Sequence, residues 1–196
     1  MGGVFEFRGV DNLVYAEVTA DTKESYTAGE VKSLAATAEI GKTVETSTAT
    51  KYYDNKPLIN ISSEGADEIT ITCAPLDIET LADITGKKYD KTAGALIDGV
   101  REVRYFAIGY RTKGTDGEYR YVWRYKGTFA IPDETSKTED DGTDSDNQEL
   151  TFTGISTTHE FGASGACKGL VIDTRKNGKD VATFFNTVLT PDKLTE

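Results

Sequence analysis

Apolar and polar residues alternate along several stretches of this chain, and segments rich in Gly, Asp, Asn and Pro separate these stretches. A period of two is typical of half-buried β-strands. The alternation is clearest at 68–73, where Ile69, Ile71 and Cys73 are spaced by threonines and are expected in the core. Strands are predicted at 13–19, 31–40, 43–50, 68–73, 101–111, 119–129, 150–155 and 169–174. Turns are predicted at 11–12, 21–29 and 52–57. The pattern therefore indicates a mainly β protein.

The best candidate hairpin joins 101–111 to 119–129 through the Gly- and Asp-rich residues 112–118. One face of its second strand carries Tyr119, Tyr121, Trp123 and Tyr125. Its first strand offers Val103, Tyr105 and Ala107 as apolar neighbours. We expect the aromatic face to pack in the core or in a subunit interface. Stacking of sugars or bases on this face is the alternative.

Two short helices are predicted to flank the strands. Asp77 can cap the first helix, Ile78, Leu81 and Ala82 form its apolar stripe, and Gly86 can end it. In 180–189 the apolar residues recur at i, i+3, i+4, i+7 and i+8, which favours a second helix capped by Asp180. A strand is the alternative for this segment.

Length and charge narrow the choice of function. A chain of 196 residues fits one large β domain, and 37% hydrophobic residues suffice for a packed core. The net charge of −11 argues against tight binding of nucleic acid, which needs clustered Lys and Arg. No apolar run is long enough for a membrane span, and the N-terminus does not resemble a secretory signal. We therefore expect synthesis in the cytosol, with Cys73 and Cys167 as free thiols.

Candidate catalytic and metal-binding residues form no familiar motif. His159 is the only histidine, and Cys167 follows it at a spacing that fits neither a Cys/His nucleophile nor a zinc site. Phosphate-binding glycine loops are absent from the sequence. An acidic loop is predicted at 133–149, and its EF-hand-like residues are Asp140, Asp141, Asp144 and Asp146. Because the spacing fails the EF-hand pattern, a solvated loop is favoured over a weak cation site. We predict no cofactor, no metal and no enzymatic activity.

Several segments, taken in order, resemble one family. They are 12–19 (NLVYAEVT) with 26–29 (YTAG), 69–72 (ITIT) leading into 81–86 (LADITG), 119–127 (YRYVWRYKG), 150–154 (LTFTG), and Phe184-Phe185 with Pro191. The chain resembles the major tail proteins of long-tailed phages that infect Gram-positive bacteria, which are the subunits of their tail tubes. Two features depart from the family pattern. One is the long acidic insert near Asp140, and the other is Arg124, where the family would have an apolar residue.

The resemblance implies a single tail-tube domain over 1–196, built as a β-sandwich-like or curled sheet with one or two short flanking helices. Six copies would form a ring, and rings would stack into a tube around a tape-measure protein, bounded by tail-tip or terminator proteins. Double-stranded DNA would pass through the tube without specific binding. The expected location is the virion tail, assembled in the cytoplasm of the bacterial host. The alternative is a β-sandwich binding module, an adhesin or carbohydrate-binding domain, that uses the Tyr/Trp face.

Residues 43–57 are the predicted inter-subunit arm. A threonine-rich strand with two polar faces is an aggregation hazard in a monomer, but in a tube it can pair with the edge of a neighbour. The candidate assembly residues are Thr46, Thr48, Thr50, Tyr52, Tyr53, Asp54 and Lys56.

Overall fold

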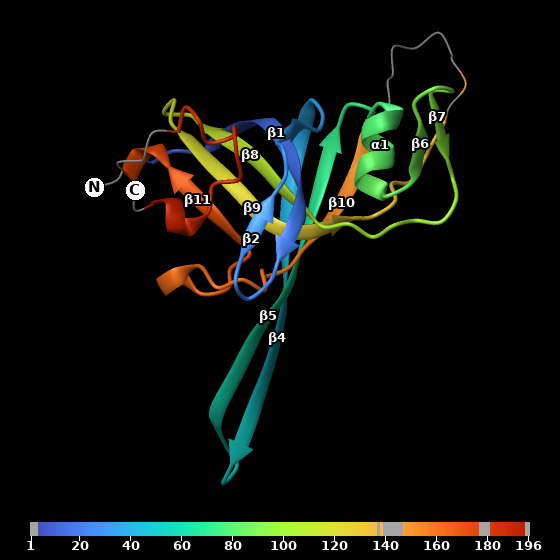
Figure 1. Cartoon of the computed structure of the whole chain (residues 1–196). Coiled ribbons are helices and arrows are strands. Elements are labelled where there is room, and N and C mark those ends of the chain that lie inside the picture. The colour runs from blue at the N-terminus through green and yellow to red at the C-terminus, as the bar shows by residue number, and fades with distance from the viewer. Residues whose placement is uncertain (1–3, 137, 139–146, 177–180, 195–196) are drawn as a thin grey trace.

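The computed structural model describes residues 4–136, 138, 147–176 and 181–194 (Figure 1). The strands are β1 Phe7–Asp21, β2 Tyr26–Ala28, β3 Lys32–Ser33, β4 Thr37–Tyr53, β5 Lys56–Cys73, β6 Lys88–Asp90, β7 Ala95–Ile97, β8 Phe106–Gly114, β9 Tyr119–Phe129, β10 Gln148–Gly154 and β11 Gly169–Asp173. The helices are α1 Ile78–Thr85 and the short 3₁₀ helices η1 Gly162–Ser164, η2 Thr174–Lys176 and η3 Pro191–Leu194. These elements confirm the prediction of a mainly β protein.

One large antiparallel sheet forms the body of the molecule. Its strands follow the order β2-β1-β8-β9-β10-β5-β4, with β3 paired to β1 and β11 paired to β9. β1 and β4 lie near opposite ends of this order yet contact each other, so the sheet curls. A separate pair, β6 and β7, lies beside α1 (Figure 1).

Apolar side chains cover both faces of the sheet, because successive residues of a strand point to opposite sides. The core on the α1 side contains Leu13, Tyr15, Leu34, Ile69, Ile71, Cys73, Ile84, Phe106, Ile108, Tyr110, Val122, Phe129, Leu150 and Phe152. The core on the other side contains Ala16, Ala107, Tyr121, Trp123, Tyr125, Phe161, Phe184 and Val188. Ile69, Ile71 and Cys73 are fully buried, as their alternation predicts.

The aromatic face of β9 is covered by the C-terminal segment. The indole Nε1 of Trp123 donates a hydrogen bond to the Phe184 carbonyl at 3.1 Å, and the hydroxyl of Tyr125 donates to the Leu189 carbonyl at 2.9 Å. The predicted packing role of this face is therefore confirmed. The predicted neighbours are confirmed only at Ala107, because β8 begins at Phe106 and leaves Val103 and Tyr105 exposed.

Residues 181–189 are neither the favoured helix nor the alternative strand. They form turns, in which the Phe184 amide donates to the Val181 carbonyl and the Asn186 amide donates to the Thr183 carbonyl. Both Phe184 and Phe185 pack against Tyr121 and Trp123. The Phe184 carbonyl accepts from the Trp123 indole, whereas a helix would use this carbonyl for its own i→i+4 hydrogen bond. The predicted cap, Asp180, lies outside the described residues.

Of the other local predictions, the helix caps are confirmed and some of the turns and strands are not. Asp77 caps α1 by accepting from the Thr80 amide, and Gly86 ends the helix at φ 69°, both as predicted. The turn predicted at 11–12 is wrong, because Asn12 at φ 54° forms an irregularity within β1. The prediction of a turn at 21–29 is wrong for residues 26–28, which form strand β2. The strand predicted at 31–40 is divided into β3 and β4, because the chain leaves the ladder around Leu34, which is buried and donates its amide to the Leu13 carbonyl.

Candidate assembly site

A long hairpin made by β4 and β5 projects from the body (Figure 1). β5 pairs with β10 only from Asp67 to Cys73, whereas its pairing with β4 continues from Cys73 to Lys56. Within the described residues, 46–64 have no strand partner outside the hairpin, and we call them the distal arm. The arm has eight residues on β4 (46–53) and nine on β5 (56–64), and eight paired residues extend about 25 Å.

The tip of the distal arm is a two-residue turn. Asp54 and Asn55 lie at φ 49° and 60°, and Tyr53 pairs with Lys56 across them. Two successive left-handed residues are typical of the type I′ turn that fits the twist of a hairpin, and Asp and Asn tolerate this conformation well. The predicted turn at 52–57 is therefore confirmed as the end of the hairpin, although Pro57 belongs to β5.

The two faces of the distal arm differ in character. Thr46, Thr48 and Thr50 share one face, and their cross-strand partners are Glu64, Ser62 and Asn60. On the opposite face Ala49 pairs with Ile61 and Lys51 pairs with Ile59. The predicted assembly threonines therefore form a polar face, and an apolar face lies behind them. Tyr52, Tyr53, Asp54 and Lys56 are brought together at the tip.

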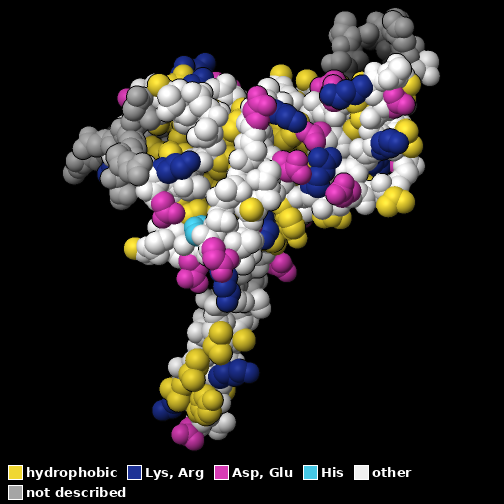
Figure 2. Space-filling view, in the orientation of Figure 1, with side chains coloured by type: hydrophobic (Ala, Val, Ile, Leu, Met, Phe, Trp, Pro, Cys, Tyr) yellow, Lys and Arg dark blue, Asp and Glu magenta, His cyan; other side chains and the backbone are white. Residues whose placement is uncertain are grey.

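The apolar side chains of the distal arm are open to solvent. Tyr52, Tyr53, Leu58, Ile59 and Ile61 are each between 47% and 67% exposed. Figure 2 shows hydrophobic side chains gathered along the outer part of the arm. Contiguous exposed apolar residues are typical of surfaces that bind a partner, and they make this part of the arm a candidate assembly site.

Leu58, Ile59 and Ile61 were not among the sequence-predicted assembly residues. The alternation of Ile59 and Ile61 with Asn60 and Ser62 would have identified these two, but not Leu58, which lies at an irregularity of the pairing. This alternation predicts a strand with one apolar face.

A buried carboxylate lies where the arm leaves the sheet. The side chain of Asp67 is 2% exposed and accepts hydrogen bonds from Lys42 at 3.0 Å and Lys168 at 2.7 Å. Lys168 also donates to the Gly65 carbonyl, and Arg124 lies 4.0 Å from the carboxylate. Burial alone would raise the pKa of Asp67, but the bonds from Lys168 and Lys42 hold that pKa below its usual value. These ion pairs connect the base of the arm to β9 and to the residue preceding β11.

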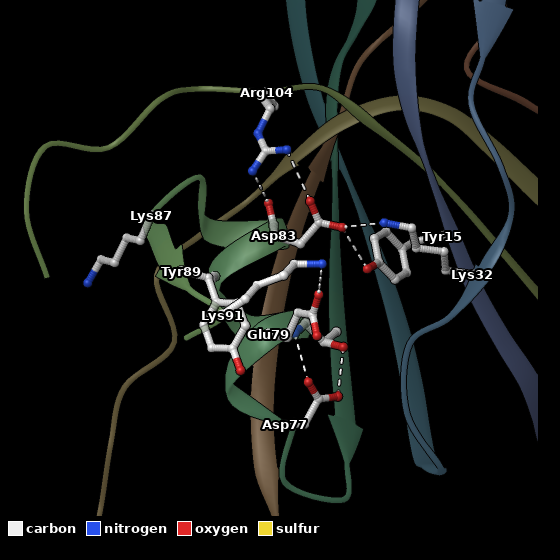
Figure 3. Close-up of a pocket in the computed structure, with 11 residues that line it drawn as sticks. Tyr15, Lys32, Asp77, Glu79, Asp83, Lys87, Tyr89, Lys91 and Arg104 are labelled. Atoms are coloured by element: carbon white, nitrogen blue, oxygen red, sulfur yellow. Dashed lines mark hydrogen bonds and ion pairs between the residues drawn. The ribbon is translucent and has the colours of Figure 1, made fainter. Parts of the chain in front are cut away.

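A polar pocket of about 600 Å³ lies beside α1 (Figure 3). At its centre Asp83 accepts hydrogen bonds from Tyr15 at 2.8 Å, Lys32 at 3.0 Å and Arg104 at 3.0 Å. Burial opposes ionisation of Asp83, but the bonds from Lys32 and Tyr15 hold its pKa below the usual value. Because Tyr15 lies in β1 and Lys32 in β3, these hydrogen bonds attach α1 to the sheet.

The remaining candidate residues have structural contacts. His159 places its Nδ1 3.1 Å from the Lys23 carbonyl and donates its amide to Asp21. Cys73 is buried and Cys167 half-buried, both as free thiols. In the described part of the chain, no three His, Cys, Asp or Glu side chains group in a way that could hold a metal ion. None of the helices described there is long and apolar enough to cross a membrane.

The acidic loop is described only in part. Asp140, Asp141, Asp144 and Asp146 lie outside the described residues. At its end the predicted loop 133–149 overlaps β10, which begins at Gln148.

A comparison with protein-family models found no match, and a comparison with curated proteins found no significant similarity.

Proposed function

We propose that this chain is a structural subunit that assembles with copies of itself, as the major tail protein of a long-tailed phage does. The observation that carries the proposal is the distal arm, with its apolar face exposed beyond the body. Ile59 and Ile61 are about half exposed, so covering them in a neighbouring subunit would contribute about 0.7–1.5 kcal/mol each, half of the value for burying a fully exposed side chain. An arm that contacts a different surface of the next copy gives a head-to-tail interface, which closes into rings or continues as a filament.

The charge of the chain supports a tube that conducts DNA. A protein of net charge −11 repels the phosphate backbone, so DNA can move past it without being held. In this proposal the tube surrounds a tape-measure protein, ends at tail-tip and terminator proteins, and belongs to a virion assembled in the host cytoplasm. The role is structural, and we propose no catalytic residue.

The alternative, a sugar-binding module, is less well supported. Its binding surface was expected on Tyr119, Tyr121, Trp123 and Tyr125. Trp123 and Tyr125 are fully buried, and Phe161, Phe184 and Phe185 pack against this group. A sugar would need to bind elsewhere on the molecule.

Replacing Ile59 and Ile61 by aspartate is expected to abolish assembly. The variant Ile59→Asp/Ile61→Asp removes two apolar contacts and places two charges in the interface, so the association constant should fall about 100-fold or more. Negative-stain electron microscopy should show rings or tubes of the unmodified protein and dispersed monomers of the variant. Its free energy of unfolding should change by less than about 1 kcal/mol, because both positions are exposed.

The matched control is Asn60→Asp/Ser62→Asp, which adds the same charges on the polar face of the same strand. This variant should assemble better than the first. Deleting residues 52–56 should block assembly and leave a folded body. Rings or tubes formed equally well by Ile59→Asp/Ile61→Asp would contradict the proposal. So would an unmodified protein that stays monomeric at every concentration.

A further inference from the structure

A second exposed apolar surface lies on the body, between β7 and β8. Residues 97–105 form an extended segment that runs under the body from β7 to the start of β8 (Figure 1). Val100 is 97% exposed and Val103 62% exposed, and Ile97 and Tyr105 are also exposed. Arg101 donates to the Phe129 carbonyl, which places the segment beside the end of β9 and near the exposed Ile131. We call residues 97–105 with Ile131 the acceptor strip.

The acceptor strip presents negative charge with its apolar side chains. Asp98 and Glu102 are exposed, although Asp98 also pairs with Lys87 at 2.6 Å. Its two arginines are engaged with the body, Arg101 with the Phe129 carbonyl and Arg104 with Asp83. The surface offered to a partner is therefore apolar and acidic.

The tip of the distal arm has the complementary character. Lys51 and Lys56 are exposed beside Tyr52, Tyr53 and the apolar face, and Asp54 is the only acidic residue between 46 and 63. The tip therefore has one more positive than negative charge in a protein of net charge −11, whereas Glu64 at the base of the distal arm makes the arm as a whole neutral. The two lysines at the tip and the exposed Asp98 and Glu102 of the acceptor strip give the two apolar surfaces opposite charges, which favours one partner surface over others.

The backbone of the acceptor strip also suits the arm. Two of its backbone bonds to the rest of the chain are from Val18 to the Tyr105 carbonyl and from Glu102 to the Gly86 carbonyl. Ile97 ends β7 and pairs with Lys88, but residues 98–105 belong to no strand. Within the described residues, the side of β4 away from β5 also has no partner along the distal arm. An extended segment and an open strand edge can pair by addition of a strand.

From these observations we propose that the distal arm of one copy binds the acceptor strip of a second copy of this chain. This inference rests on the proposed self-assembly and names the surface that receives the arm. The arm points away from its own body, so the contact forms between copies (Figure 1). Each copy then keeps one free arm or one free strip, and the contact is propagated from subunit to subunit.

Photo-cross-linking from the arm tests the location of the contact. The purified full-length protein would carry p-benzoylphenylalanine in place of Tyr53, and the cross-linked dimers would be mapped by mass spectrometry. Cross-links to 97–105 or to residues around Ile131 are expected. Cross-links to another surface of the second copy would overturn the acceptor strip and leave the proposed function intact. Absence of cross-linked dimers at concentrations up to the solubility limit would overturn both.

Charge reversal tests the pairing independently. Lys51→Glu/Lys56→Glu should weaken association at least 10-fold, and adding Asp98→Lys/Glu102→Lys to the same chain should restore most of it. In the matched control, Glu24→Lys/Glu30→Lys is added to Lys51→Glu/Lys56→Glu instead. Glu24 and Glu30 are exposed acidic residues outside the strip, and replacing them changes the net charge by the same amount. Equal rescue by the control would show a general charge effect and overturn the inference. Failure of Asp98→Lys/Glu102→Lys to rescue would do the same, while assembly of the unmodified protein would still support the proposed function.

Discussion

Replacing Trp123 by alanine is expected to lower the free energy of unfolding by about 3–5 kcal/mol, which is the cost of truncating a large buried aromatic side chain. Trp123 is fully buried and stacks on Phe184 with 6.3 Å between ring centroids. Its ring lies so close to Gly109 that a Cβ there would come within 2.9 Å of it. Removing the indole therefore leaves a cavity between β8, β9 and the C-terminal segment.

Chemical denaturation followed by circular dichroism measures this loss. Val171→Ala on the adjacent β11 is the control, because Val171 is 47% exposed and its truncation should cost less than about 1 kcal/mol. A loss of less than about 1 kcal/mol for Trp123→Ala would contradict the packing described here. Because Trp123 is the only tryptophan, its emission in arm variants also reports whether the body remains folded.

Replacing Asp67 by asparagine is expected to cost about 3 kcal/mol near neutral pH, because it leaves positive charges without their buried partner. Lys42 and Lys168 both donate to this carboxylate, and Arg124 lies next to it. The substitution preserves the shape of the side chain, so the effect isolates the charge. Glu68→Gln, at the exposed neighbouring position, should change the free energy of unfolding by less than about 0.5 kcal/mol.

The cost of Asp67→Asn should depend on pH. The pKa of Asp67 is lowered in the folded protein, so its stabilising effect is complete above the unfolded value of about 3.9 and is lost as the pH falls through the folded value. The difference between the two proteins should be full above about pH 5 and should shrink below about pH 4. A difference that stays constant down to pH 2.5 would mean that the ion pairs contribute little.

Much of the fold follows from local sequence. The alternation at 68–73, the Gly- and Asp-rich turn between β8 and β9, and the cap at Asp77 are decided by residues near one another in the chain, and each was predicted. The predictions that were wrong concern segments whose structure depends on tertiary contacts. Residues 181–189 have a helical period, but the segment forms turns in which the Phe184 and Leu189 carbonyls accept hydrogen bonds from Trp123 and Tyr125 of β9. At 31–40, burial of Leu34 against β1 divides one apparent strand into two.

The candidate site could be predicted only in part. The threonine-rich strand and the Asp-Asn turn identify an extended hairpin, because both features are local. The alternation at 59–62 indicates an apolar face on β5, but the position of this face opposite Ala49 and Lys51 depends on the cross-strand register, for which the sequence has no local signal. The sequence also does not predict that Val100 and Val103 are exposed. The local pattern of apolar and polar residues around an exposed valine can be the same as that around a buried one.

The turn at Asp54 and Asn55 gives the hairpin a fixed reach. Because cross-strand register is set from this turn, the distance from Asp67 to the tip is counted in whole residues, about 3.3 Å for each pair added or removed. Adding one pair would also turn the tip side chains to the other face, whereas adding two would preserve their direction. In the proposed assembly, the number of residues in the hairpin would therefore set the spacing between neighbouring subunits.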